Sequence, residues 1–362
     1  MTKAERILLA LLQAGLWEKA DLNMTAGLLP CSEEDWQEVY RLAQQQTVSG
    51  IIYQGLLRLP DPLLPPRSLL LRWTVLIDRI EQRNRQMNSL LADLFRLFRN
   101  KGWEAVVQKG QGTALLYGQP LWRECGDIDL CFPNFADGEK AADFLLKASP
   151  QKPEKEADGS LTYLLRGIRI EHHRTLLDFQ NPFLQPHLNR FIRKYGLTEA
   201  VLPEGEGAFT IPAPMTHVLL LNAHILKHVL GWGIGLRQLC DLALAYDRFS
   251  GQLEADDLYG LYRKAGLRKW NDLLHAFLTE CIGLPADRLP YPSAAKVSPL
   301  PLLEKVMQTG NFGLQRQGRT TAKAWTRKWH TLKAFCQNAS FTLNYAPQEG
   351  CWTTLRLLKG NL

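Results

Sequence analysis

Hydrophobic residues recur at helical spacing over the first hundred positions of the chain. Apolar side chains return every three or four residues in segments 7–17 and 36–43, and again along one side of segment 70–99. The third segment ends at Asn100-Lys101-Gly102, which is typical of a helix C-cap. Prolines gather in segment 59–66, so the pattern predicts two short helices, a boundary and one long helix.

After residue 102 the pattern changes to short strand-like runs. These runs occupy residues 105–107, 128–132, 161–165 and 168–172, and a helix-length segment, 136–148, follows the second of them. Helical spacing returns after Pro182 and predicts helices over residues 214–230, 236–249, 255–265 and 268–282.

These patterns predict an α+β protein in which a small mixed β-sheet core lies between helical N-terminal and C-terminal regions. We place the divisions at residues 1–75, 76–180, 181–290 and 291–362. The last segment combines a proline-rich linker with a basic C-terminal part.

Composition supports a globular chain with a sizeable core, because 46% of the 362 residues are hydrophobic and 22% are charged. No apolar run approaches the roughly 18 to 20 residues that span a bilayer. Lys3 and Arg6 precede an apolar run, as in a signal peptide, but Glu5 and Gln13 interrupt it, so an amphipathic helix is favoured. The seven cysteines lack CxxC spacing. We therefore expect a reduced, cytoplasmic protein that makes no membrane contact.

The net charge of +7 is concentrated near the C-terminus, where residues 304–362 carry nine Lys or Arg against two Glu. Such a segment attracts polyanions, so nucleic acid, anionic lipid or a phosphorylated ligand are possible partners beside a plain solvated surface. Between Arg316 and Lys333, Trp325, Trp329 and Leu332 recur at helical spacing. This favours a helix packed on the core over a nucleic-acid reader.

Carboxylates gather around the second strand-like run. Asp127 and Asp129 lie two residues apart in an extended segment, so their side chains share one face about 6 to 7 Å apart. Hard oxygen ligands of this kind suit Mg²⁺. Glu171, in a second run, is the best candidate for a third carboxylate that would hold a pair of metal ions. The alternatives are that Asp127 and Asp129 lie on a solvent-facing edge strand and that Glu171 is an ordinary surface residue.

A glycine-rich turn precedes these carboxylates. Lys109-Gly110-Gln111-Gly112 runs from a strand into a short helix and offers backbone amides to a phosphate. Lys109 and Arg123 either contact phosphate or are solvated.

Histidine pairs occur in two places. His172 and His173 beside Glu171 suggest a general base or a group supporting the site, with a structural role also open. His224 and His228 have zinc-like spacing, but packing or a hydrogen bond to Asp241 is favoured.

Three motifs occur in a fixed order: Lys-Gly before a short helix, then Gly126-Asp127-Ile128-Asp129-Leu130, then a hydrophobic-Glu-His strand. This order resembles the nucleotidyltransferase superfamily related to DNA polymerase beta, in its poorly characterised bacterial branch. Residues 224–228 and 237–242 are similar to that branch's downstream helices. The resemblance covers roughly residues 90–247.

This resemblance implies metal ligation by Asp127, Asp129 and Glu171, and it matches Gly110 to the glycine of the nucleotide-holding turn. We expect two Mg²⁺ ions at the carboxylates and nucleotide binding by Lys109, Gly110, Gln111 and Arg123. It implies transfer of a nucleoside monophosphate from a nucleoside triphosphate to an unidentified acceptor hydroxyl or phosphate. The superfamily usually has Gly-Ser or Gly-Gly at the turn, whereas this chain has Gly110-Gln111. A catalytically weak nucleotide-binding or regulatory protein is therefore the alternative, and a nucleic-acid-binding module driven by the basic segment is a third.

Overall fold

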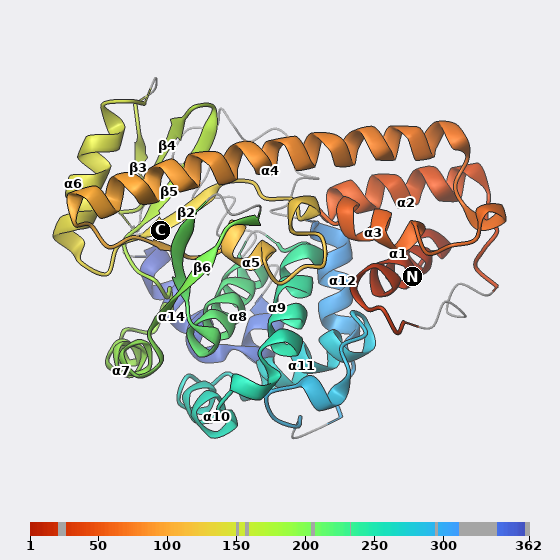
Figure 1. Ribbon diagram of the computed structural model, residues 1–362. Coiled ribbons are helices and arrows are strands. Elements are labelled where there is room, and N and C mark those ends of the chain that lie inside the picture. Colours follow the sequence, from red (N-terminus) through yellow and green to blue (C-terminus); the bar gives the residue numbers. More distant parts are fainter. Residues whose placement is uncertain are drawn as a thin grey trace.

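A computed structural model describes residues 1–20, 27–149, 152–155, 159–203, 207–231, 233–293, 296–310 and 339–358. The predicted basic segment between Arg316 and Lys333 lies outside these described residues. The fold is α+β, as predicted: a small mixed sheet lies at one end of the long helix α4 (Arg67–Lys101), and helices surround the other end (Figure 1).

Three helices begin the chain, namely α1 (Lys3–Leu16), α2 (Glu33–Gln45) and α3 (Ser49–Leu56). The Thr2 hydroxyl accepts a hydrogen bond from the Glu5 amide, and the Glu5 carboxylate accepts one from the Thr2 amide, so a capping box begins α1. The apolar side chains of α1 are buried in the core. The prediction of a helix at this position is confirmed.

Helix α4 connects the two hydrophobic cores. Its first half contributes Trp73 to a helical core, and its second half, from Met87 onward, packs on the sheet. The helix ends at Gly102, whose φ of 68° is the left-handed conformation that glycine adopts readily. The predicted boundary at residues 75 and 76 falls inside α4, and the division into four domains stays a prediction.

The sheet has five strands in the order β1-β2-β5-β4-β3. Strands β2 and β5 are parallel, and the other pairs are antiparallel. Helix α6 (Phe135–Leu146) follows β2. The strands are β1 (Val106–Val107), β2 (Ile128–Cys131), β3 (Glu154–Lys155), β4 (Leu161–Leu165) and β5 (Ile168–His173). Four of the five were predicted, and the short β3 was missed.

A helix and a hairpin between β5 and α8 were also missed. They are α7 (Gln185–Tyr195) and the antiparallel pair β6 (Leu197–Val201) and β7 (Ala208–Pro212). Strand β6 is half-exposed or exposed throughout, so it lacks the apolar alternation that identifies a strand in a sequence.

The predicted C-terminal helices are confirmed as α8 (Pro214–Leu230), α9 (Leu236–Arg248), α10 (Ala255–Lys264) and α11 (Arg268–Glu280), and α12 (Leu300–Thr309) and α14 (Pro347–Leu358) follow them. Helices α8 to α12 share one hydrophobic cluster with α1 to α3, although the two groups are far apart in the sequence. In Figure 1 helices α8 and α9 lie beside the sheet, across from α4. No helix in the described ranges is long and apolar enough to cross a membrane.

Candidate functional site

The parallel pair β2 and β5 brings two carboxylates together. Ile128, Leu130 and Ile170 are fully buried, which turns the intervening acidic residues to the opposite face of the sheet. Asp129 and Glu171 are direct partners in the register of this pair. The structure therefore brings Asp129 and Glu171 together from adjacent strands, and the convergence of all three carboxylates on a metal stays a prediction.

Strand alternation separates the two neighbouring histidines. His173 shares the face of Glu171, and its Nε2 lies 2.7 Å from Asp129 Oδ1 and 3.6 Å from Glu171 Oε2. One ligand atom from each of these three residues lies within 4.8 Å of the other two. His172 points to the other face and stacks on Phe132 with ring centroids 4.8 Å apart, which is a structural role.

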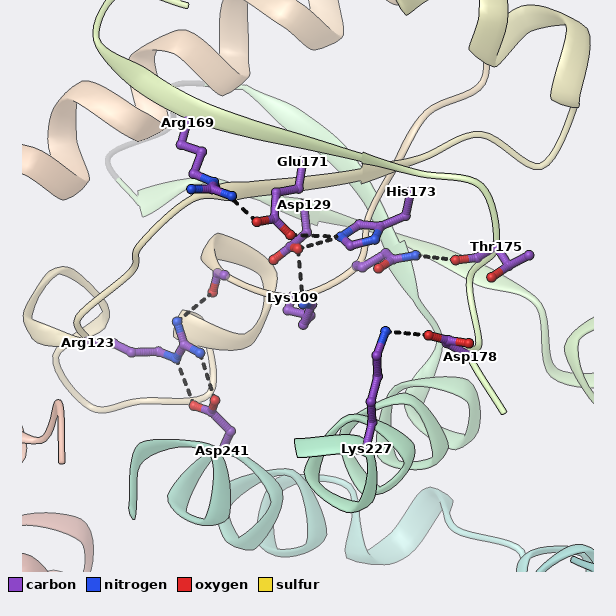
Figure 2. A network of polar contacts seen from close by, with 12 residues as sticks. Lys109, Arg123, Asp129, Arg169, Glu171, His173, Thr175, Asp178, Lys227 and Asp241 are labelled. Atoms are coloured by element: carbon purple, nitrogen blue, oxygen red, sulfur yellow. Dashed lines mark hydrogen bonds and ion pairs between the residues drawn. The ribbon is translucent and has the colours of Figure 1, made fainter. Parts of the chain in front are cut away.

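Lys109 supplies a positive charge to this cluster. The Gln108 amide donates to the Asp129 carbonyl where β1 leaves the sheet, so the next side chain faces the carboxylates. Lys109 Nζ lies 3.0 Å from Asp129 Oδ1, and Figure 2 shows Lys109, Glu171 and His173 around Asp129. Burial alone would raise the pKa of Asp129, but Lys109 and His173 outweigh it and hold that pKa below its ordinary value.

Asp127 lies immediately before β2 and is half-buried. Burial, together with the negative charges of Asp129 and Glu171, raises the pKa of its carboxyl to about 7. Its charge therefore acts on the same cluster. Among the described residues, however, the group with metal-ligand spacing is Asp129, Glu171 and His173, and it does not include Asp127. Ligation by Asp127 stays a prediction.

The turn before the carboxylates requires glycine at two positions. Gly110 has φ 60° and ψ −115°, which strains any other residue. It is followed by the short helix α5 (Gln111–Ala114). A Cβ at Gly112 would lie 2.8 Å from Ile211 Cγ2 of β7. The Gln111 side chain is 3% exposed and donates to Met87 Sδ of α4, so it points into the core.

Parallel strands with facing acidic residues, a lysine and a glycine turn match the resemblance found in the sequence. The sequence also matches the family described as "Uncharacterised nucleotidyltransferase" over residues 32–283. The chain belongs to this family. A search of curated proteins finds no match.

A similar solved structure is the crystal structure of an antigenic nucleotidyltransferase-like protein from Paracoccidioides brasiliensis. Its sequence identity to this chain is 16%, the TM-score is 0.32, and the match covers 57% of this chain and 93% of the other.

In this member of the nucleotidyltransferase family, Arg123 supports the glycine turn from the core side. Its side chain is 5% exposed, and the guanidinium binds both carboxylate oxygens of Asp241 on α9 at 2.7 Å each. A third nitrogen donates to the Gly110 carbonyl at 3.4 Å, and the Tyr117 hydroxyl donates to Asp241 at 2.6 Å. Burial opposes ionisation of Asp241, but Arg123 outweighs it and lowers the pKa. The phosphate contact of Arg123 stays a prediction, and these contacts give it a positioning role.

Helix α8 forms the opposite side of the site. The rings of His224 and His228 lie 4.3 Å apart. Burial lowers the pKa of both rings, and the charge of Lys109 lowers it further, so both are neutral at neutral pH. The sequence also suggested Asp241 as a hydrogen-bond partner of these two histidines. In the structure Asp241 binds Arg123 and Tyr117. Lys227 of the same helix pairs with Asp178 at 2.5 Å (Figure 2).

The sequence did not predict His173 as one of the three residues with metal-ligand spacing. Its place two residues after Glu171 was the available signal, since residues two apart in a strand share a face. The Arg123–Asp241 pair had no such signal, because its partners are far apart in the chain.

Proposed function

We propose that this protein transfers a nucleoside monophosphate from a nucleoside triphosphate to an acceptor hydroxyl or phosphate, with the help of a divalent cation. The observation that carries this proposal is the pairing of Asp129 with Glu171 across β2 and β5, beside Lys109 and the Gly110 turn. Membership of the nucleotidyltransferase family supports it.

Asp129 and Glu171 would hold the cation, with Asp127 as a further carboxylate. When bound, a pair of divalent ions supplies charge neutralisation at the attacking oxygen and the leaving pyrophosphate. The acceptor oxygen attacks the α-phosphorus, the bond to the β-phosphate oxygen breaks, and pyrophosphate leaves. The acceptor's proton passes to solvent or to a carboxylate of the site.

Lys109 has two states in this proposal. Without ligand, its ammonium compensates the charge of buried Asp129. When the carboxylates hold a cation, that ion pair is no longer needed, and Lys109 can contact a phosphate oxygen of the nucleotide. The backbone of the Gly110 turn lies beside this position, and Arg123 holds it in place.

The proposal is tested by thermal unfolding of the protein with each of the four ribonucleoside triphosphates plus MgCl₂ or MnCl₂. We expect one or more nucleotides to raise the melting temperature only when the cation is present. Asp129→Asn should abolish this rise. Asp143→Asn, a change of an exposed aspartate on α6, is the matched control and should leave it unchanged.

Pyrophosphate release in the presence of mixed sugar, nucleoside and phosphate acceptors then separates the two leading functions. Release that needs Asp129 supports transfer. Nucleotide binding without release of pyrophosphate in any mixture would support the nucleotide-binding or regulatory alternative. Absence of any nucleotide-dependent rise would overturn the proposal.

A further inference from the structure

We propose that His173 is a nitrogen ligand of the cation, and that the site therefore binds Mn²⁺ more tightly than Mg²⁺. This inference deepens the proposed function, because it concerns the identity of the cation at the same site and rests on that site's holding one. It adds one imidazole to the carboxylate site for Mg²⁺ that the sequence predicts.

The spacing of the three side chains fits one shared ion. Neighbouring ligands of an octahedral cation with bonds of about 2.1 Å are about 3 Å apart. His173 Nε2 lies 2.7 Å from Asp129 Oδ1 and 3.6 Å from Glu171 Oε2, on either side of that value. All three ligand atoms lie within 4.8 Å of one another, so rotations of the side chains can bring them to coordinating positions.

The location of His173 is determined by the strand that also carries Glu171. Both side chains lie on the same face of β5. Glu171 is the register partner of Asp129, and His173 follows Glu171 by two residues. Its side chain is 21% exposed, so solvent and a cation can reach it.

Two donors now share one oxygen of Asp129, since both Lys109 Nζ and His173 Nε2 lie within 3.0 Å of Oδ1. A bound cation would occupy this position and remove the need for both contacts. The neutral imidazole then carries its proton on Nδ1 and offers the Nε2 lone pair to the ion.

Ligand chemistry gives the preference among cations. Mg²⁺ takes oxygen ligands almost exclusively, whereas imidazole suits first-row transition ions, and Mn²⁺ accepts both kinds. A nitrogen in the ligand set thus adds affinity for Mn²⁺ and little for Mg²⁺. Two carboxylates alone would give Mn²⁺ a smaller advantage, so the direct evidence for a nitrogen ligand is its coupling to the bound Mn²⁺.

The first test uses the wild-type protein and Mn²⁺ alone, without nucleotide. Pulsed electron paramagnetic resonance of the bound Mn²⁺ should show coupling to an imidazole ¹⁴N nucleus. Competition with Mg²⁺ should require at least about a tenfold excess of Mg²⁺ to displace half of the Mn²⁺. A Mn²⁺ spectrum without ¹⁴N coupling, or equal affinity for both ions, would overturn the inference.

Two variants then assign the nitrogen to one residue. His173→Gln should remove the ¹⁴N coupling and weaken Mn²⁺ binding at least about tenfold. His173→Asp should restore binding through oxygen and shift the preference toward Mg²⁺. His187→Gln, a change on α7 away from the site, should alter neither property. Persistence of the coupling in His173→Gln would contradict the assignment.

These measurements involve no nucleotide, so their outcome is independent of the transfer assay. Mn²⁺ coordination by His173 in a protein that never binds nucleotide would sustain the inference and defeat the proposed function. Nucleotide transfer with a cation that lacks nitrogen ligation would give the reverse result.

Discussion

Replacing Asp127 with asparagine should stabilise the cation-free protein at alkaline pH. The folded structure raises the pKa of this carboxyl from 3.8 to about 7, because burial and the charges of Asp129 and Glu171 disfavour its ionised form. One pKa unit corresponds to 1.36 kcal/mol, so ionised Asp127 costs up to about 4 kcal/mol of folding free energy. Solvent screening of this half-buried group reduces the measured gain to about 1 to 3 kcal/mol.

The sign of the effect defines its pH dependence. Below pH about 4 the carboxyl is protonated in both the folded and the unfolded chain, so it costs nothing. Between about pH 4 and 7 the unfolded chain ionises first and the cost grows, and above pH 7 it is constant. The advantage of Asp127→Asn over the wild type should therefore be small near pH 4 and largest at pH 8.

Urea unfolding in EDTA at pH 4.5, 6 and 8 measures this difference. Asp143→Asn on α6 is the control for loss of one carboxylate and should give no pH-dependent gain. If Asp127→Asn destabilises the protein at pH 8, or stabilises it equally at all three values, Asp127 does not face the other two carboxylates as the reasoning requires.

Adding MnCl₂ or MgCl₂ at pH 8 extends the same measurement. If Asp127 is a cation ligand, the wild type gains more stability from the cation than the variant, and the order of the two proteins reverses at saturation. An equal gain in both proteins would remove Asp127 from the ligand set and leave Asp129, Glu171 and His173.

Three further changes test the groups that support the site. Asp241→Asn breaks the buried pair with Arg123 and should cost about 3 to 5 kcal/mol of unfolding free energy, measured by urea denaturation; a loss below about 1 kcal/mol would contradict the pair. Gly110→Ala should cost about 1 to 3 kcal/mol and weaken the nucleotide-dependent rise in melting temperature, whereas Gly126→Ala, where a Cβ meets none of the described residues within 4 Å, should be neutral in both assays. His172→Phe keeps an aromatic ring and removes a buried nitrogen, Nδ1, that has no hydrogen-bond partner among the described residues, so stability should stay unchanged or rise by about 1 kcal/mol, and a fall above about 2 kcal/mol in thermal unfolding would show that this nitrogen is bonded.

The elements of this fold could largely be predicted from the sequence because their signals are local. The apolar spacing of segment 70–99 and the glycine after it predicted α4 and its end at Gly102. Alternation around Asp129 predicted a strand with buried neighbours. Strand β6 was missed for the corresponding reason, since it is half-exposed or exposed along its whole length and carries no apolar alternation.

Part of the site was also determined locally. A glycine stands at position 110 because other residues are strained in the backbone conformation of this turn. Glu171 and His173 share a face because side chains in a strand alternate with a period of two residues. The sequence alone therefore contained the residues of the proposed cation site. It did not show which of them meet.

Tertiary structure decided the partners. Only the parallel register of β2 and β5 places Glu171 opposite Asp129, and only the packing of α9 against the glycine turn commits Arg123 to Asp241. The same holds for the core that α1 to α3 share with α8 to α12. Strand order, register and helix packing depend on the summed burial of many distant side chains, so no local pattern specifies them.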